Sequence, residues 1–262
     1  MKVAIIGSGN MGGAIARGLF RSGRIAASDL TCSARSQETL DTISRDIPGS
    51  SVTTDNSKAV EEADIVILAV KPWLVEQVIN GLKESLKNSQ IIISVAAGIG
   101  TAQLATMLTD KDGKVPAIFY LIPNIAVEAC QGVSLYCTAN AGQEQINIVE
   151  DLFSGIGFVM RVEEKQMSAG TAIASCGIAY VFRYIRAIME GGVEMGFYPK
   201  DAQEIAIATL KGAASILELH GTHPEQEVDK VTTPGGLTIR GLNAMEEAGF
   251  THAVIAGLKA GK

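Results

Sequence analysis

The chain has 262 residues, 47% of them hydrophobic, and its formal net charge at pH 7 is −6. This length and composition predict one large domain or two smaller ones with a buried core, and exclude a disordered chain. The acidic balance offers no basic surface for nucleic acid. None of the four cysteines (Cys32, Cys130, Cys137 and Cys176) has CxxC spacing. We therefore expect buried free thiols and a cytoplasmic protein.

Neither a targeting segment nor a membrane segment is expected. The apolar run that follows Met1 ends at Gly7, which is too short for a secretory signal. No stretch is judged long and apolar enough to span a bilayer, so we expect no membrane partner.

The first predicted element is a strand, Val3–Ile6, followed by the loop Gly7-x-Gly9-x-x-Gly12 and a helix over Ala14–Arg21. This order is the context in which the glycine motif binds a dinucleotide. The glycines permit a tight turn, backbone approach to the pyrophosphate, and close packing of helix on strand. A purely structural glycine turn is the alternative. The cofactor residues predicted here are Ile6, Gly7, Ser8, Gly9, Asn10, Met11 and Gly12.

Strands and helices then alternate to about residue 160. Apolar runs predict strands at Leu30–Ser33, Ile65–Val70, Ile91–Val95, Ile118–Ile122 and Val133–Tyr136. Helical patterns lie between the earlier runs, at Glu38–Ile47, Leu74–Leu86 and Ala102–Leu108. Continuous apolar strands separated by helices indicate a parallel sheet buried on both faces. A helix at Glu144–Phe153 and a strand at Phe158–Val162 close this Rossmann-type α/β domain, residues 1–160.

Residues 161–262 are predicted to form an all-α domain. Helices are expected over Met167–Met195, from Pro199 to about Leu219, after Gly236 and after Thr251. The first of these helices is apolar around much of its circumference, and such a helix must be buried on all sides. About a hundred residues can hardly bury it, so we expect this domain to form a homodimer.

The end of the second strand indicates which cofactor binds. NAD-binding folds place Asp or Glu there to hold the ribose 2′-hydroxyl, but the segment Thr31–Ser36 contains no acid. Ser33, Arg35 and Ser36 could instead surround a 2′-phosphate, with Arg35 forming a charge-assisted contact. This predicts NADP, with NADPH preferred and NADH possible. A solvated loop arginine is the alternative.

Other candidates follow later strands, whose carboxyl ends face the ligand crevice. Lys71 can meet a phosphate, a substrate carboxylate or the nicotinamide, or it is an ordinary loop lysine before a helix begun by Pro72. Small residues after the fifth strand let a flat ring approach the backbone. Asn56 is a cofactor candidate that could instead cap a helix. The remaining candidates are Ala69, Val70, Pro72, Ala96, Ala97, Gly98 and Asn124.

Several motifs together resemble one family, pyrroline-5-carboxylate reductase. They cover nearly the whole chain in order, and the Pro-Gly-Gly-x-Thr motif is specific to the family. The matching segments are Gly7–Met11, Asp55–Asn56, Leu68–Pro72, Val95–Gly98, Pro123–Asn124, Glu190–Val193 and Val231–Thr238.

The resemblance implies NAD(P)H-dependent reduction of 1-pyrroline-5-carboxylate to L-proline, the last step of proline biosynthesis. It also implies a helical domain that dimerises, with dimers assembling into a ring. The cyclic imine would lie between the nicotinamide and the Pro-Gly-Gly loop, with Thr238 as proton donor or orienter and Lys71 as a second catalytic residue. A helix cap and turn is the alternative for this loop. The implied substrate residues are Cys176, Val231, Thr233, Gly235, Gly236, Leu237 and Thr238.

The chain departs from the family pattern at the start of its long helix. Ala174 and Cys176 replace two hydroxyl residues, and Ile178 replaces a proline. These changes leave open a related substrate, such as the six-membered cyclic imine, or a non-catalytic nucleotide sensor. The β-hydroxyacid dehydrogenases share the two-domain plan, but their Lys-x-x-Asn motif is absent because Lys211 is followed by Gly-Ala-Ala.

The histidines do not suggest a metal site. His220 and His223 lie close together and His252 is distant, but no supporting Cys or carboxylate motif accompanies them. We expect no metal and a surface turn before Pro224.

Overall fold

A computed structural model describes residues 1–262, which form two compact units, Met1–Ser175 and Cys176–Lys262. The boundary between the units falls after residue 160 in the sequence, because the residues that follow still pack on the first unit. Met167 is buried in its core. Gly170 lies so close to Leu135 that an added Cβ would come within 2.2 Å of its Cδ1.

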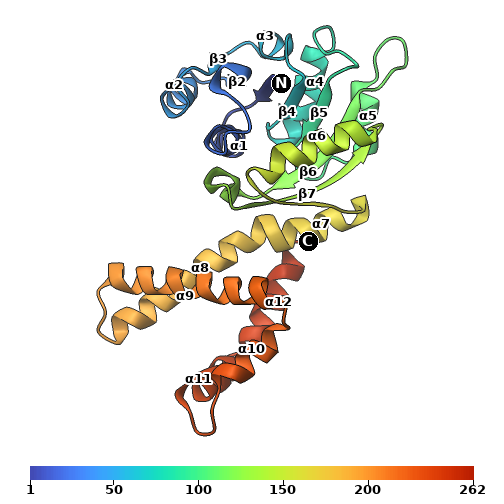
Figure 1. Ribbon diagram of the computed structural model, residues 1–262. Coiled ribbons are helices and arrows are strands. Elements are labelled where there is room, and N and C mark those ends of the chain that lie inside the picture. The colour runs from blue at the N-terminus through green and yellow to red at the C-terminus, as the bar shows by residue number, and fades with distance from the viewer. The chain divides into compact units, whose positions relative to one another are not determined.

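The first unit is built on one eight-stranded sheet with strand order β3-β2-β1-β4-β5-β6-β7-β8 (Figure 1). The four central apolar strands agree closely with the predicted runs. The strands are β1 (Val3–Ile6), β2 (Leu30–Ser33), β3 (Ser51–Thr53), β4 (Ile65–Leu68), β5 (Ile91–Ser94), β6 (Ala117–Pro123), β7 (Gly132–Ala139) and β8 (Gly157–Arg161).

Helices cover both faces of this sheet, as the continuous apolar strands predict. Along β1, Val3 and Ile5 belong to one buried cluster, and Ala4 and Ile6 belong to the other. One cluster includes side chains of α1 (Asn10–Arg21), α2 (Gln37–Asp46) and α6 (Gln143–Ser154). The other includes side chains of α3 (Asn56–Val60), α4 (Val75–Leu82) and α5 (Thr101–Leu108).

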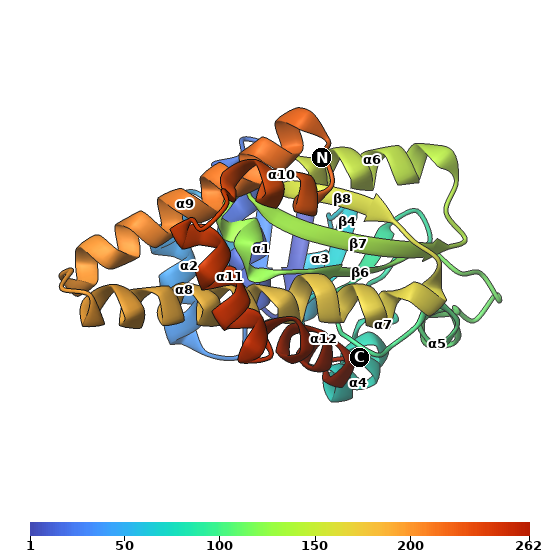
Figure 2. The ribbon, with the colours of Figure 1, turned by 90° about the horizontal axis from the view of Figure 1, so that it is seen from below.

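The sheet is not wholly parallel. β7 runs antiparallel to β6, with Tyr120 opposite Cys137, and β8 is parallel to β7. Figure 2 shows these three strands side by side. The expectation of a parallel sheet is wrong at this edge because the link from Pro123 to Gly132 holds only a 3₁₀ turn, Ile125–Ala129. A parallel crossover needs a longer connection.

The second unit consists of α8 (Gly177–Glu194), α9 (Pro199–His220), α10 (Pro224–Val231), α11 (Leu237–Glu247) and α12 (Phe250–Ala260). α8 and α9 form a hairpin, packed so closely that a Cβ on Gly192 would come within 2.9 Å of Ala202 Cβ. Tyr180 Oη donates to Gly257 O at 3.1 Å and links α8 to α12.

The predicted helix Met167–Met195 is three segments in one helical run. α7 (Met167–Gly170) passes through a π-helical turn, Thr171–Cys176, into α8. With the preceding 3₁₀ turn this run extends over Glu164–Glu194, and its length and mean hydropathy of 1.3 would suffice to cross a membrane. The expectation that no stretch is long and apolar enough is therefore wrong, since the π turn joins two helices without a break.

Candidate dinucleotide-binding site

A cavity of about 930 Å³ opens at the carboxyl ends of the central strands of the first unit. Its walls come from the loops that follow β1, β2, β4 and β5, with the end of β6 at one side. β1 lies between β2 and β4, so the strand order changes direction at this point. Ligands of open α/β sheets bind in such a crevice, and the volume suits an extended small molecule.

The glycine loop forms one wall, and its geometry explains each glycine. Gly7 has φ +96°, and a Cβ there would lie 2.7 Å from Val70 Cγ1. A Cβ on Gly12 would lie 2.3 Å from Gly7 O, whereas one on Gly9 would meet nothing within 4 Å. Gly7 and Gly12 are therefore required by the protein's own packing. Gly9 has no such internal reason, and it caps the N-terminus of α1, where free N–H groups favour an anion.

Ser8 supplies the clearest sign that this loop binds a ligand. Its side chain is 2% exposed, and its Oγ has no hydrogen-bond partner. Buried polar groups in folded proteins nearly always have a partner. The glycine loop and this hydroxyl therefore fit a bound phosphate group.

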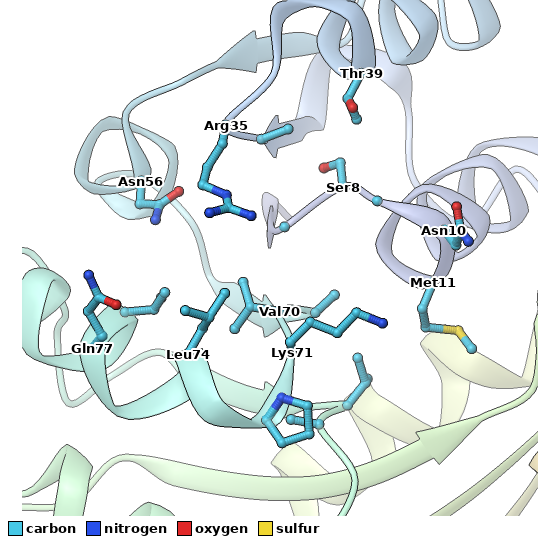
Figure 3. Close-up of a pocket in the computed structure, with 18 of the residues that line it drawn as sticks. Ser8, Asn10, Met11, Arg35, Thr39, Asn56, Val70, Lys71, Leu74 and Gln77 are labelled. Carbon is cyan, nitrogen blue, oxygen red and sulfur yellow. The ribbon is translucent and has the colours of Figure 1, made fainter.

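The loop after β2 brings a single cation to the cavity. Figure 3 shows the Arg35 guanidinium pointing into the space between Asn56 and Ser8. Ser36 and Thr39 line the same end. Ser33 does not line it: this residue is fully buried, and its Oγ donates to Asn56 Oδ1 at 2.7 Å.

Asn56 is the first residue of α3, and the helix cap is its neighbour. Asp55 Oδ1 accepts from Ser57 N at 2.9 Å and from Lys58 N at 3.3 Å. The alternative that Asn56 caps the helix is therefore wrong, and its carboxamide faces the cavity instead.

Lys71 and the turn after β5 form the opposite end. The Lys71 side chain reaches along the cavity toward Met11 in Figure 3. Ala96 and Ala97 line the cavity, and Gly98 follows at φ +83°, donating its N–H to Tyr120 Oη at 3.0 Å.

The Asn124 carboxamide forms hydrogen bonds with backbone groups around it. Its Oδ1 accepts from Ala126 N and Val133 N, both at 3.2 Å, and its Nδ2 donates to Ala174 O at 3.3 Å. Nearby, Ser175 Oγ donates to Pro123 O at 2.7 Å, which fixes the π-helical turn to the end of β6. Thr171 and Ser175 of this turn line the cavity.

Most predicted cofactor residues line this one cavity. Those that do not are Ile6, Gly12, Ser33, Gly98 and Asn124, of which all but Gly98 are buried. Sequence reasoning missed the residues contributed by α4, although a helix that begins directly after a cavity-lining loop was a usable signal. The lining residues that were not predicted are Ala34, Thr39, Asp55, Ser57, Leu74, Gln77, Val78, Gly81, Leu82, Val95, Ile122, Pro123, Thr171 and Ser175.

The predicted substrate residues form a turn within the second unit. Gly236 N donates to Thr233 O at 2.9 Å, and Gly235 has φ +70°. A Cβ on Gly236 would lie 2.5 Å from Thr233 Oγ1. Gly236 caps α11 and Thr238 lies exposed in the first turn of that helix. Leu237 is 80% exposed and Val231 is 64% exposed, and Cys176 lies separately, just before α8.

The remaining candidate groups are structural. His220 ends α9, and His223 caps α10 by accepting from Glu225 N at 3.3 Å. The expected surface turn before Pro224 is the short, largely exposed link between these two helices. No three His, Cys, Asp or Glu side chains gather as a metal site would require. All four cysteines are free. Burial raises the pKa of Cys32 to about 11, which keeps this thiol neutral.

Family models match both parts of the chain. Residues 164–262 match "Pyrroline-5-carboxylate reductase dimerisation", and residues 2–98 match "NADP oxidoreductase coenzyme F420-dependent". Among solved structures, the Plasmodium falciparum pyrroline carboxylate reductase with NADP bound has a TM-score of 0.89 at 26% identity, covering 100% of this chain and 95% of that one. The Streptococcus pyogenes 1-pyrroline-5-carboxylate reductase has a TM-score of 0.87 at 30% identity, covering 100% and 96%.

Curated relatives carry the same name. Pyrroline-5-carboxylate reductase 1 of Dictyostelium discoideum is 38% identical over 98% of this chain, which spans 48% of that longer protein. Pyrroline-5-carboxylate reductase 2 of the same organism is 36% identical over 98% of this chain and 89% of its own length. The Methanosarcina acetivorans enzyme is 33% identical over 97% and 94%. With both of its parts and nearly all of its length matched, the chain belongs to the pyrroline-5-carboxylate reductase family.

Proposed function

We propose that this protein reduces 1-pyrroline-5-carboxylate to L-proline with NADPH, as the last step of proline biosynthesis. The observation that carries the proposal is the cavity at the change of strand order, with its glycine loop and unpartnered Ser8 hydroxyl, in a chain of this family. The cofactor supplies a hydride to the carbon of the C=N bond. The protein supplies binding, orientation and a proton.

The pyrophosphate is assigned to the loop Gly7–Met11 and the N-terminus of α1. The backbone is open at Gly9, where nothing lies within 4 Å of an added Cβ. The Ser8 hydroxyl is free to donate a hydrogen bond. The helix N-terminus adds N–H groups and the positive end of the dipole. Ile6 and Gly12 act from behind this wall.

The adenosine end is assigned to Arg35, Ser36 and Asn56, and we propose that NADPH is preferred over NADH. Arg35 is exposed toward the cavity and forms no ion pair in the structure. The nearby carboxylate, Asp55, is already engaged in capping α3. A 2′-phosphate would thus meet a free cation and no free anion, with Ser33 acting through Asn56.

The nicotinamide end is assigned to the loops after β4 and β5. Ala96 and Ala97 offer a flat wall of small side chains, and Lys71 brings a positive charge near the reacting centre. Asn124 acts from behind, since its carboxamide is occupied by backbone groups. The wall residues are Ala69, Val70, Lys71, Pro72, Ala96 and Ala97, and Gly98 follows them in the chain.

The substrate is assigned to the turn before α11. The N–H groups at the start of this helix are suited to the substrate carboxylate. Thr238 lies one residue further along the helix, and its hydroxyl would donate to or orient the imine nitrogen. The residues proposed to contact substrate are Cys176, Val231, Thr233, Gly235, Gly236, Leu237 and Thr238.

We further propose that the protein is a homodimer in the cytoplasm, assembling into a ring of dimers, with no nucleic-acid or membrane partner. In the second unit only Gly192, Ala202 and Ala206 are buried, while Val181 and Phe182 are 47% and 57% exposed. A unit with so little core needs a partner surface, and a second copy of the dimerisation region supplies one. Burial against a second copy also explains why the helical run Glu164–Glu194 is long and apolar, without placing it in a bilayer.

A second candidate substrate is the six-membered homologue of the cyclic imine. The motivation is the segment Ala174–Ile178, where the family's hydroxyl and proline residues are replaced. The decisive experiment follows NADPH oxidation with 1-pyrroline-5-carboxylate and with its six-membered homologue at equal concentrations. We expect the five-membered ring to have the higher kcat/KM. A preference for the larger ring would reassign the substrate, and NADPH binding without turnover of either would indicate a nucleotide sensor.

A further inference from the structure

We propose that the Tyr120 hydroxyl is a positioning group for the nicotinamide half of the cofactor, because it fixes the cavity-lining turn Val95–Gly98. The inference rests on the proposed dinucleotide binding and does not depend on which imine is reduced. Tyr120 itself does not line the cavity. Its effect must therefore pass through the turn.

Tyr120 reaches the turn from a neighbouring strand. It lies on β6, paired with Ser94 of β5 on one side and with Cys137 of β7 on the other. The residue is 6% exposed, and its Oη accepts the N–H of Gly98 at 3.0 Å. Burial raises the pKa of Tyr120, so the oxygen remains a neutral phenol.

The start of the turn is held by Val95 N, which donates to Leu68 O at 3.0 Å, and by Ala96 N, which donates to Ser94 Oγ at 3.4 Å. The Tyr120 hydrogen bond holds Gly98. Among the N–H groups of Ala97, Gly98 and Ile99, only that of Gly98 has an acceptor within the protein. Gly98 has φ +83°, a conformation that glycine tolerates but does not prefer over others. The Tyr120 acceptor therefore favours the Gly98 conformation that points this N–H at the phenol oxygen.

The far side of the segment is held by a separate contact. Glu164 accepts from Thr101 N at 3.1 Å and from Thr101 Oγ1 at 2.5 Å. This carboxylate fixes the start of α5. Because Glu164 holds the end and Tyr120 holds the middle, removing the phenol oxygen would loosen Val95–Gly98 without releasing the helix.

The turn lies toward the nicotinamide half of the proposed site. The glycine loop follows β1, the Arg35 loop follows β2 on one side of β1, and the turn follows β5 on the other side, beyond β4. A dinucleotide lies across such a change of strand order with its pyrophosphate at the glycine loop. With the 2′-phosphate assigned to Arg35, Val95–Gly98 is left for the nicotinamide.

The test compares two ligands on two tyrosine variants. Tyr120→Phe keeps the ring and removes only the hydroxyl, whose oxygen accepts from Gly98 N. Tyr136→Phe is the matched control, since Tyr136 is also a buried sheet tyrosine, but its Oη donates to Glu150 Oε1 at 2.6 Å and does not line the cavity. The ligands are NADPH and adenosine 2′,5′-bisphosphate, which lacks the nicotinamide half. Thermal melting establishes that each variant is folded.

We expect Tyr120→Phe to raise the Kd of NADPH about three- to tenfold, the usual effect of losing one neutral hydrogen bond. The Kd of adenosine 2′,5′-bisphosphate should not change, and Tyr136→Phe should change neither. An unchanged Kd for NADPH in folded Tyr120→Phe, or equal weakening of both ligands, would overturn the proposal. If NADPH binds but 1-pyrroline-5-carboxylate is not reduced, the reaction is misassigned while the role of Tyr120 stands.

Discussion

Ser33 Oγ donates a hydrogen bond to Asn56 Oδ1 across 2.7 Å, which ties the end of β2 to the first residue of α3. Ser33 is fully buried, whereas Asn56 lines the cavity beside Arg35. The serine therefore acts on the proposed 2′-phosphate end by orienting the carboxamide. Ser33 could support NADPH binding by contacting the cofactor directly or by orienting Asn56, and this hydrogen bond favours the second role.

We predict that the effects of Ser33→Ala and Asn56→Ala on NADPH binding are not additive. Ser33→Ala alone should lower the free energy of unfolding by about 0.5–1.5 kcal/mol, the contribution of one neutral hydrogen bond. It should also weaken NADPH binding, but have no further effect once Asn56 is Ala. Urea unfolding and NADPH titration of the double-mutant cycle measure both quantities. Full additivity would mean that Ser33 contacts the cofactor directly.

Arg35→Ala should raise the KM for NADPH about tenfold or more, because one charge-assisted hydrogen bond contributes about 1.5–3 kcal/mol. The KM for NADH, which lacks the 2′-phosphate, should change little. Arg45→Ala is the control, since Arg45 lies on α2 outside the cavity and should leave both values unchanged. Equal effects of Arg35→Ala on the two cofactors would remove the assignment of the 2′-phosphate to this loop.

The central strands could be predicted because burial on both faces leaves long apolar runs, as at Val3–Ile6. β3 was missed because Ser51–Thr53 is short, partly exposed and polar. α10 was missed because half of the residues of Pro224–Val231 are charged and none is buried. The His223-Pro224 start was its one usable signal, a cap followed by proline.

The glycine loop and Arg35 could be located because their chemistry is carried by residue type and position after a strand. The contribution of Leu74, Gln77 and Val78 was signalled only by their position directly after a cavity-lining loop, since by residue type they look like part of any amphipathic helix. The roles of Ser33 and Asn124 depended on hydrogen-bond partners far away in the sequence. Such pairings follow from the tertiary fold and leave no local pattern.

Gly9→Ala should weaken cofactor binding, whereas Gly12→Ala should lower stability. A Cβ at position 9 meets nothing within 4 Å, whereas at position 12 it would lie 2.3 Å from Gly7 O. Gly9→Ala should keep the parent melting temperature but raise the Kd of NADPH about tenfold or more, by obstructing the pyrophosphate. Gly12→Ala should lower the melting temperature, because overpacking costs about 1–3 kcal/mol. Normal NADPH binding by folded Gly9→Ala would count against this loop as the phosphate site.

Thr238→Ala should lower kcat about 10²–10⁴-fold if the hydroxyl transfers the proton, and less if it only orients the substrate. The Kd of NADPH should stay unchanged, because the cofactor is assigned to the first unit. Thr238→Ser keeps the hydroxyl and should retain most activity. If folded Thr238→Ala turned over substrate at the parent rate, Thr238 would have no part in the reaction and only a structural place in the first turn of α11.

The second unit should not exist as a folded monomer. Sedimentation at low micromolar concentration should show a dimer or a larger assembly, because the unit buries so little of its own apolar surface. Phe182→Asp, at a position 57% exposed in the single chain, should lower the melting temperature and dissociate the assembly. A compact, active monomer would contradict the proposed interface.

The most direct test of the proposed reaction uses NADPH deuterated at the transferred position of nicotinamide C4. The enzyme is incubated with 1-pyrroline-5-carboxylate, and the product is analysed by chiral chromatography and mass spectrometry. We predict L-proline carrying one deuterium on the ring carbon that was double-bonded to nitrogen, formed in equal amount to the NADPH consumed. NADPH consumption without labelled proline, or no consumption by enzyme that binds NADPH, would contradict the proposed function.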